Sequence, residues 1–509
     1  MYFTKNINMK NKGILSGALV LSAGGVLAKV FSAIYRIGLT RILGGVGIGM
    51  YQLIFPLYSL CVVFATAGVP MAISKVVAKN KNKDGAILKK SIVYISVICL
   101  TLMFILLVSS NGLAALQGNK DLTVCYIILV PSILLVGFAS VLRGYFQGKH
   151  NFIPSAISNI IEQFVKFVVG LLLSLILIKI SLLASVIGAM VSIVVSEIIE
   201  LVVLLICLKK SYKRNNTKIE FSYKELTKEI LPITLTNIIL PISSFIDSVL
   251  VVNLLKINFS NSLSVFLYGV ESGAVSSLVS LPSIFSFAIA SVILPNIVEG
   301  VNKHNRSNKL SLAVKIVLII SVPCVLGFLI LPNRLITLLY GTRLNSLGVN
   351  GVAIASNLLT ISSLGVVFLT LNQLFSSSLQ AIDKSGITIR NLSLAVVVKF
   401  VIEVIFMPSK KLNIFALAVA NSLCYILVMC LNYFELRENF NLKLNYIFAG
   451  KLILSNAVMV VSLICVLVLG ESVMNTILAV LIAVVMYFYS LFRFKIFNRR
   501  DKAIFKYKY

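Results

Sequence analysis

The chain has 509 residues, of which 59% are hydrophobic and only 12% are charged, and its mean hydropathy is +1.00. An average soluble protein has roughly 45–50% apolar and about 25% charged residues, so this composition excludes a series of soluble domains. A formal net charge of +29 would suggest nucleic acid binding in a soluble protein. In a membrane protein, the distribution of the positive charge instead indicates which loops face the cytoplasm. We therefore expect no nucleic acid partner.

Apolar runs of about 20 residues recur along the chain, which is the length a helix needs to cross roughly 30 Å of hydrocarbon. They predict an all-α polytopic membrane protein with about fourteen transmembrane helices. In chain order these lie near residues 14–37, 50–77, 91–112, 122–142, 153–178, 182–208, 230–254, 274–298, 311–331, 351–379, 387–408, 413–433, 449–469 and 473–492.

The distribution of basic residues predicts the orientation of these helices. If both termini are cytoplasmic, the cytoplasmic segments hold 31 Lys and Arg residues and the external segments hold 9, which agrees with the positive-inside rule. The basic start of the chain precedes an apolar run without a small-residue cleavage site, so we interpret that run as the first span. We therefore expect a multi-pass protein of the cell membrane with both termini in the cytoplasm.

An internal repeat predicts two related halves. A shift of 233 residues places Val165-Lys166-Phe167 on Val398-Lys399-Phe400, and the order of four prolines agrees with this match. Two six-helix bundles in parallel relation explain both observations. The predicted organisation is an N-terminal lobe (1–208), a basic cytoplasmic linker (209–229), a C-terminal lobe (230–434), two additional transmembrane helices (435–492) and a basic cytoplasmic tail (493–509).

Charged side chains within the spans fall at helical spacing. Glu162 and Lys166 are four residues apart, and so are Lys399 and Glu403. Residues at this spacing share a helix face, so we expect two intramembrane charge pairs that tie each bundle together. By contrast, Glu197 and Glu200 lie near the inner end of the sixth span, and we expect them to face lipid headgroups.

The first span carries two cations and no acidic residue. Lys29 and Arg36 are seven residues apart and therefore lie on nearly the same face, which must meet other helices or water. They can line a cavity for an anion, with Lys75 as a third cation, or tie the two bundles together through Asp247. Asp247 is also our candidate for a coupling-ion or proton site.

Features of enzymes are missing from the sequence. It contains no nucleotide-binding motif and no nucleophile with a base, and its two histidines and eight scattered cysteines do not form a metal-binding motif. We therefore predict neither an enzyme nor a cofactor or metal. The glycine-rich run at 44–49 is not a phosphate loop, because no strand precedes it. We interpret it as a tight turn between two helices.

Three segments, at residues 36–58, 67–78 and 142–163, resemble the stage V sporulation protein B family. This family is part of the polysaccharide-transporter branch of the superfamily that also contains lipid II flippases and multidrug and toxin extrusion (MATE) antiporters. The resemblance implies a MATE-like fold of six plus six helices that works by alternating access around a cationic cavity. Arg36, with Lys29 on its face, matches functionally important arginines of the flippases. Those flippases carry an acidic residue early in the second helix, where this chain has Tyr51 or Gln52.

The resemblance implies a flippase for an undecaprenyl-pyrophosphate-linked peptidoglycan or polysaccharide precursor, acting in spore cortex or cell-wall synthesis. Its partners would be the lipid-linked anionic saccharide and membrane lipids. An ion-coupled multidrug antiporter is one alternative, although a cationic cavity repels cationic drugs. The other alternative is a non-transporting partner of cell-wall synthesis proteins.

Overall fold

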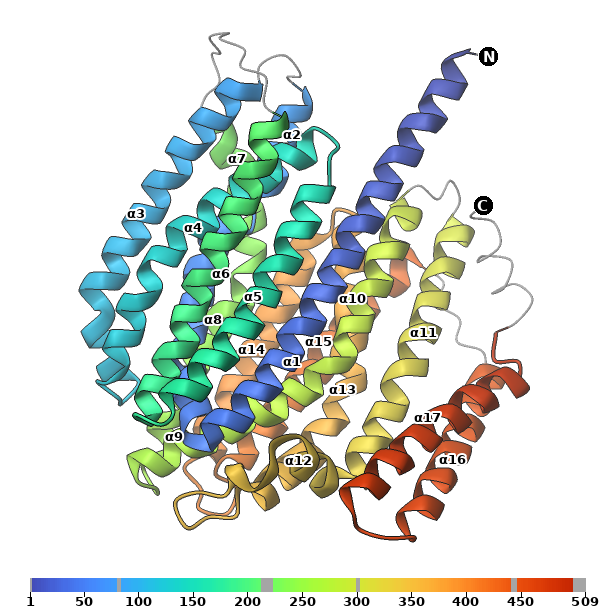
Figure 1. Cartoon of the computed structure of the whole chain (residues 1–509). Coiled ribbons are helices and arrows are strands. Elements are labelled where there is room, and N and C mark those ends of the chain that lie inside the picture. The colour runs from blue at the N-terminus through green and yellow to red at the C-terminus, as the bar shows by residue number, and fades with distance from the viewer. Residues whose placement is uncertain (1, 80–83, 212–222, 299–302, 441–445, 498–509) are drawn as a thin grey trace. The chain divides into compact units, whose positions relative to one another are not determined.

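The computed structural model describes residues 2–79, 84–211, 223–298, 303–440 and 446–497, and these are almost entirely helical (Figure 1). Helices are the expected solution for apolar segments of this length, because backbone polar groups in hydrocarbon must be hydrogen-bonded within the segment. The all-α prediction is therefore confirmed for the described part of the chain.

The helical elements follow one another with short connections. They are α1 (Tyr2–Thr66), α2 (Val69–Lys79), α3 (Asp84–Leu116), α4 (Leu122–Gly148), α5 (Ile153–Leu177), α6 (Leu182–Ser211), α7 (Tyr223–Asn237), α8 (Ile239–Leu255), α9 (Asn261–Gly269), the π-helix η1 (Val270–Val275), α10 (Ser276–Val298), α11 (Lys303–Ile330), α12 (Pro332–Tyr340), the 3₁₀-helix η2 (Gly341–Leu344), α13 (Gly351–Ala381), α14 (Ser385–Phe406), α15 (Phe415–Asn439), α16 (Tyr446–Leu467) and α17 (Val473–Arg493).

Among the described residues, eleven helices are long and apolar enough to span a membrane, or twelve if the bent pair α7 and α8 counts as one span. Each of the fourteen predicted spans coincides with helical residues, so the lower count arises from how individual helices are divided and counted. The first run, Ala23–Lys79, contains two predicted spans, and α7 meets α8 at a 46° bend. Helix α14, with three charged residues, is not among the eleven.

The glycine-rich run makes the turn that the sequence predicts. Gly44 has φ 66° and ψ −171°, and it divides α1 into two helices at a kink. A positive φ is readily adopted only by glycine. A Cβ atom at this position would also lie 2.8 Å from the carbonyl oxygen of Arg343. The kink therefore depends on glycine for both conformation and space.

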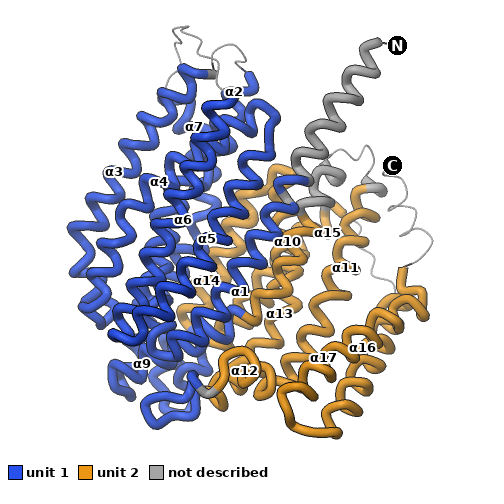
Figure 2. The backbone as a smooth tube through the Cα atoms, in the orientation of Figure 1, with its two compact units in different colours: residues 1–277, 343–351, 402–417 blue, residues 278–342, 352–401, 418–509 orange. Residues whose placement is uncertain are grey.

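The chain divides into two compact units, coloured separately in Figure 2. Unit 1 comprises residues 1–277, 343–351 and 402–417, and unit 2 comprises the remainder. The boundaries between them fall within α10, η2, α13, α14 and α15. The lobes predicted from the sequence, at 1–208 and 230–434, stay a prediction.

Unit 1 is organised around α1. This helix packs against α4, α5, α8, α9 and η1, while α5 and α6 pack against each other and α4 packs against α3 and α6. Small residues allow the closest approaches: a Cβ on Gly49 would collide with the carbonyl oxygen of Val265, and one on Gly269 with that of Gly45. Such small-residue contacts are typical of helices that associate in membranes.

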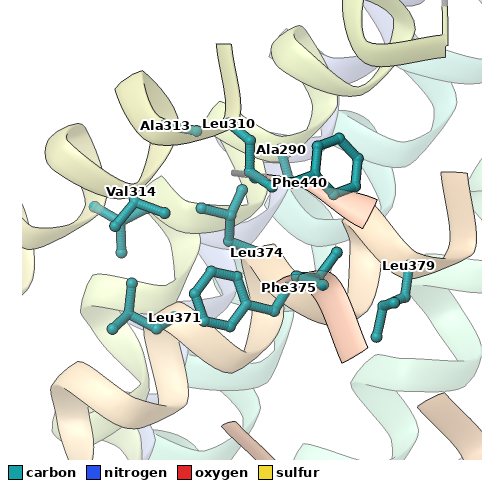
Figure 3. Close-up of a cluster of buried hydrophobic side chains, with 11 residues drawn as sticks. Ala290, Leu310, Ala313, Val314, Leu371, Leu374, Phe375, Leu379 and Phe440 are labelled. Carbon is teal, nitrogen blue, oxygen red and sulfur yellow. The ribbon is translucent and has the colours of Figure 1, made fainter. Parts of the chain in front are cut away.

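Unit 2 contains hydrophobic clusters of its own. In one of them, Phe375 and Leu374 of α13 lie beside Leu310 and Val314 of α11 and Ala290 of α10 (Figure 3). A second cluster joins α16 and α17 to α11, where the Tyr487 hydroxyl donates to the Ile319 carbonyl at 2.6 Å. Within unit 2, the last two helices are therefore packed against α11.

Apolar side chains also lie on the outside of the helices. Phe104 on α3, Val461 on α16 and Val485 on α17 are each more than half exposed. Large exposed apolar surfaces are rare on monomeric soluble proteins. The protein is therefore a multi-pass membrane protein whose outer helix faces contact lipid acyl chains.

Candidate functional site

The two cations of the first span lie on the kinked helix α1. Lys29 and Arg36 are both partly buried, and about 10 Å of helix axis separates them. The Nη2 of Arg36 donates to Oε1 of Gln52 at 3.1 Å, and Nε2 of Gln52 donates to the carbonyl oxygen of Ser272 at 2.5 Å. Gln52 lies beyond the kink, so the turn at Gly44 allows one helix element to supply both partners.

The Ser272 carbonyl belongs to the π-helix η1. A π turn leaves its backbone groups in altered positions, and such turns are frequent at functional sites. The same turn carries Glu271, which is buried and whose Oε1 accepts a hydrogen bond from Ser276 Oγ at 3.3 Å. Glu271 is not among the residues predicted from the sequence, because it lies just before the predicted span that begins at residue 274.

Asp247, the candidate coupling site, lies on α8 and is partly buried. Asp247, Glu271 and Arg36 all lie within electrostatic range of the Tyr268 hydroxyl, which donates to the Gln52 carbonyl at 3.5 Å. The structure therefore brings the predicted Arg36 and Asp247 into one polar region of unit 1. It adds a second buried carboxylate to that region.

Lys75 lies elsewhere, on α2. Its Nζ is 2.6 and 2.7 Å from the two carboxylate oxygens of Glu229 on α7. The Lys75 side chain is 50% exposed and that of Glu229 is 37% exposed. An anion that binds Lys75 must therefore displace a carboxylate that is hydrogen-bonded to it, whereas Arg36 is hydrogen-bonded to the neutral amide of Gln52.

The intramembrane pair on α5 is part of a larger cluster. Lys166 Nζ lies 3.3 Å from Glu162 Oε1. Arg143 of α4 donates through Nε to Glu200 Oε1 of α6 at 2.9 Å and through Nη2 to the same oxygen, and its Nη2 is 4.0 Å from Glu162 Oε2. Glu197 lies within electrostatic range of all four of these charges.

Two expectations about this region are wrong. Glu197 and Glu200 do not face headgroups, because they are only 6% and 0% exposed. Arg143 lies one residue beyond the predicted span 122–142, but the structure places it within α4, which continues to Gly148. The longer helix places the guanidinium beside α6, where it pairs with the buried carboxylate of Glu200.

The corresponding charges on α14 are both buried. Lys399 lies in unit 2, with its Nζ 5.7 Å from the Phe400 ring centroid, and Glu403 lies in unit 1. In unit 2, Arg390 also pairs with Glu435 at 2.6 Å. Within the described residues, no group of three or more His, Cys, Asp or Glu side chains is arranged to hold a metal ion.

The model of the family described as "Polysaccharide biosynthesis protein" matches residues 14–301. Stage V sporulation protein B of Bacillus subtilis (strain 168) is 24% identical over 353 residues, which are 66% of this chain and 68% of that protein. The lipid II flippase MurJ of the same organism is 23% identical over 422 residues, 77% of each chain. The uncharacterized membrane protein YabM is 36% identical over 162 residues, 32% of this chain, and the match spans only 30% of that relative.

Solved structures share the fold. An inward closed conformation of lipid II flippase MurJ superposes with a TM-score of 0.70 at 18% identity, covering 91% of this chain and 98% of that chain. An inward-facing multidrug resistance MATE family transporter of the MOP superfamily gives 0.67 at 14% identity, covering 83% and 97%. The predicted MATE-like fold and the resemblance to this superfamily are confirmed.

Proposed function

Because the chain belongs to the polysaccharide biosynthesis protein family, we propose that it is a flippase for an undecaprenyl-pyrophosphate-linked peptidoglycan or polysaccharide precursor. The names of two relatives, a lipid II flippase and a stage V sporulation protein, support this substrate class and a role in cell-wall or spore cortex synthesis. In this proposal the N-terminal (1–208) and C-terminal (230–434) lobes alternate access to the two sides of the membrane. Both termini remain in the cytoplasm.

The observation that carries the proposal is the environment of Arg36. The hydrogen bond that Arg36 makes goes to the neutral amide of Gln52, which leaves the charge of the guanidinium uncompensated by that partner. A pyrophosphate would gain charge-assisted hydrogen bonds there, and these are strong where water is excluded. Lys29, on the same helix face, would extend the contact, and Lys75 would bind the anion only after leaving Glu229.

Release of such an anion requires a driving force. Movement of one charge through 100 mV of membrane potential supplies about 2.3 kcal/mol. A coupling ion at Asp247 would add to this, because Asp247 and Arg36 share the surroundings of Tyr268. If an ion or proton neutralised Asp247, this carboxylate would no longer offset the positive charge of Arg36, and the anionic substrate would bind Arg36 more strongly.

A cation antiporter is the second candidate, and one observation favours it. Two carboxylates, Asp247 and Glu271, lie in the same polar region as the single guanidinium of Arg36. Carboxylates of this kind attract a cationic drug, whereas Arg36 repels it. Transport of the two substrate classes therefore separates the candidates.

The test is translocation of a fluorescent undecaprenyl-pyrophosphate-linked saccharide in proteoliposomes. We compare the wild type with Arg36→Ala and Lys29→Ala, and use Arg41→Ala as the matched control because Arg41 is exposed on the same helix. Loss of transport in folded Arg36→Ala, with transport retained in the control, supports the proposal. Wild-type transport of a cationic dye but not of the lipid would support the antiporter. If neither is moved by folded protein and Arg36→Ala is merely less stable, a non-transporting role in cell-wall assembly follows.

A further inference from the structure

The cluster of buried charges between α4, α5 and α6 is not used by the proposed substrate site. It contains three carboxylates, from Glu162, Glu197 and Glu200, and two cations, from Arg143 and Lys166. The three carboxylates are each less than a tenth exposed. An uncompensated charge in such surroundings is costly, and a buried group commonly responds by becoming neutral.

The contacts identify which carboxylate is not held in a direct ion pair. Glu162 faces Lys166 at 3.3 Å and Arg143 at 4.0 Å, and it also accepts a hydrogen bond from Gln163 at 2.7 Å. Glu200 accepts two bonds from Arg143. Oε2 of Glu197 and Oε2 of Glu200 both accept no hydrogen bond from the described residues, but Glu200 is held by Arg143 through its other oxygen, and the structure gives Glu197 no such ion pair.

We propose that this cluster is a proton-binding site, in which Glu197 carries an exchangeable proton on its buried carboxylate. One proton makes the cluster neutral, because three carboxylates then balance two cations and one proton. A metal ion is a poorer fit, since the described acidic residues are not arranged as a metal site. A proton needs no such shell of ligands.

Groups from every helix packed around Glu197 act on this proton. Glu200 of α6 and Glu162 of α5 favour its binding, whereas Arg143 of α4 and Lys166 of α5 oppose it. From α1, the hydroxyl of Tyr58 also lies within electrostatic range of Glu197. Loss of the proton would therefore leave one net negative charge in the centre of these helices.

The cluster is connected electrostatically to the face of α1. Tyr51 lies within range of both Lys166 and Arg36. Deprotonation of Glu197 leaves a negative charge that would weaken the binding of an anion near Arg36, and protonation would strengthen it. By linkage, an anion bound near Arg36 would in turn favour protonation of Glu197. This consequence rests on the proposed function, but the proton site does not.

The site is tested by counting protonated carboxyl groups in the purified full-length protein by infrared spectroscopy at neutral pH. Their carbonyl band is separate from that of carboxylates and shifts in heavy water when the proton exchanges. We expect Glu197→Gln to have one exchangeable protonated carboxyl fewer than the wild type. Lys166→Met removes a cation, so it should have one more than the wild type. Glu225→Gln, at an exposed position of α7, is the matched control and should retain the wild-type band.

Thermal stability provides an independent measurement. Glu197→Gln mimics the protonated form and should unfold at the wild-type temperature, whereas Glu200→Gln loses the partner of Arg143 and should unfold at a lower one. A folded wild type without the band, or a band unchanged in Glu197→Gln, overturns the proposal. These readouts need no substrate, so the site can be supported even if transport of the lipid fails.

Discussion

Replacing Arg143 by methionine removes the cation that Glu200 and Glu162 share. The variant keeps most of the side-chain volume but leaves a fully buried carboxylate at Glu200 without its donor. Removal of one partner from a buried ion pair typically costs about 3–5 kcal/mol. Because the Arg143 side chain is 22% exposed, we expect the lower end, about 3 kcal/mol. That is a change of more than a hundredfold in the unfolding equilibrium.

The assay is denaturant unfolding in mild detergent micelles, followed by the loss of helical circular dichroism. The matched control is the double variant Arg143→Met with Glu200→Leu, which removes both charges. Replacing both members of a buried pair by apolar groups is often close to neutral, so we expect the double variant to be more stable than Arg143→Met alone. The reasoning is refuted if Arg143→Met unfolds within about 1 kcal/mol of the wild type, or if the two substitutions are simply additive.

Three further outcomes are expected. Gly49→Ala should destabilise the folded state by about 1–3 kcal/mol in the same assay, because its methyl group meets the backbone of α9, whereas Gly386→Ala, with open space around it, should not. Gln52→Glu gives the guanidinium of Arg36 an ionic partner, so the anionic lipid should lose one charge-assisted contact with Arg36 of about 1.5–3 kcal/mol. Its affinity, measured by titration, should fall roughly tenfold or more, and an unchanged affinity would count against that contact. Lys75→Ala should leave the unfolding midpoint close to that of the wild type, because its ion pair with Glu229 is exposed, and a clear loss of stability would indicate a role beyond that pair.

Local spacing explains what could be predicted from the sequence. Glu162 and Lys166 are four residues apart on one helix, so their contact follows from helix geometry alone. The turn at Gly44 follows from the backbone freedom of glycine. The apolar runs likewise predict the positions of the helices, because a membrane-spanning helix needs about 20 consecutive apolar residues.

Tertiary contacts explain what could not be predicted. Arg143 and Glu200 are 57 residues apart on different helices, and only their packing reveals the pair. The resemblance places Tyr51 or Gln52 where the flippases carry an acid, but the hydrogen bond between Gln52 and Arg36 depends on the kink between them. Glu271 was missed, since a π turn interrupts the apolar pattern that defined the next span.

The π-helix η1 accommodates one residue more than an α-helix would between α9 and α10. Each residue of an α-helix turns the chain by about 100°, so an extra residue inside an ordinary helix rotates everything that follows it. The wider π turn absorbs such a residue within a single turn. Deleting one residue from Val270–Val275 would therefore let the turn close as an ordinary α-helix while α9 and α10 keep the faces they present. The same deletion inside α10 would instead rotate the rest of that helix by about 100° about its axis, so η1 is a place where the chain tolerates a change in length.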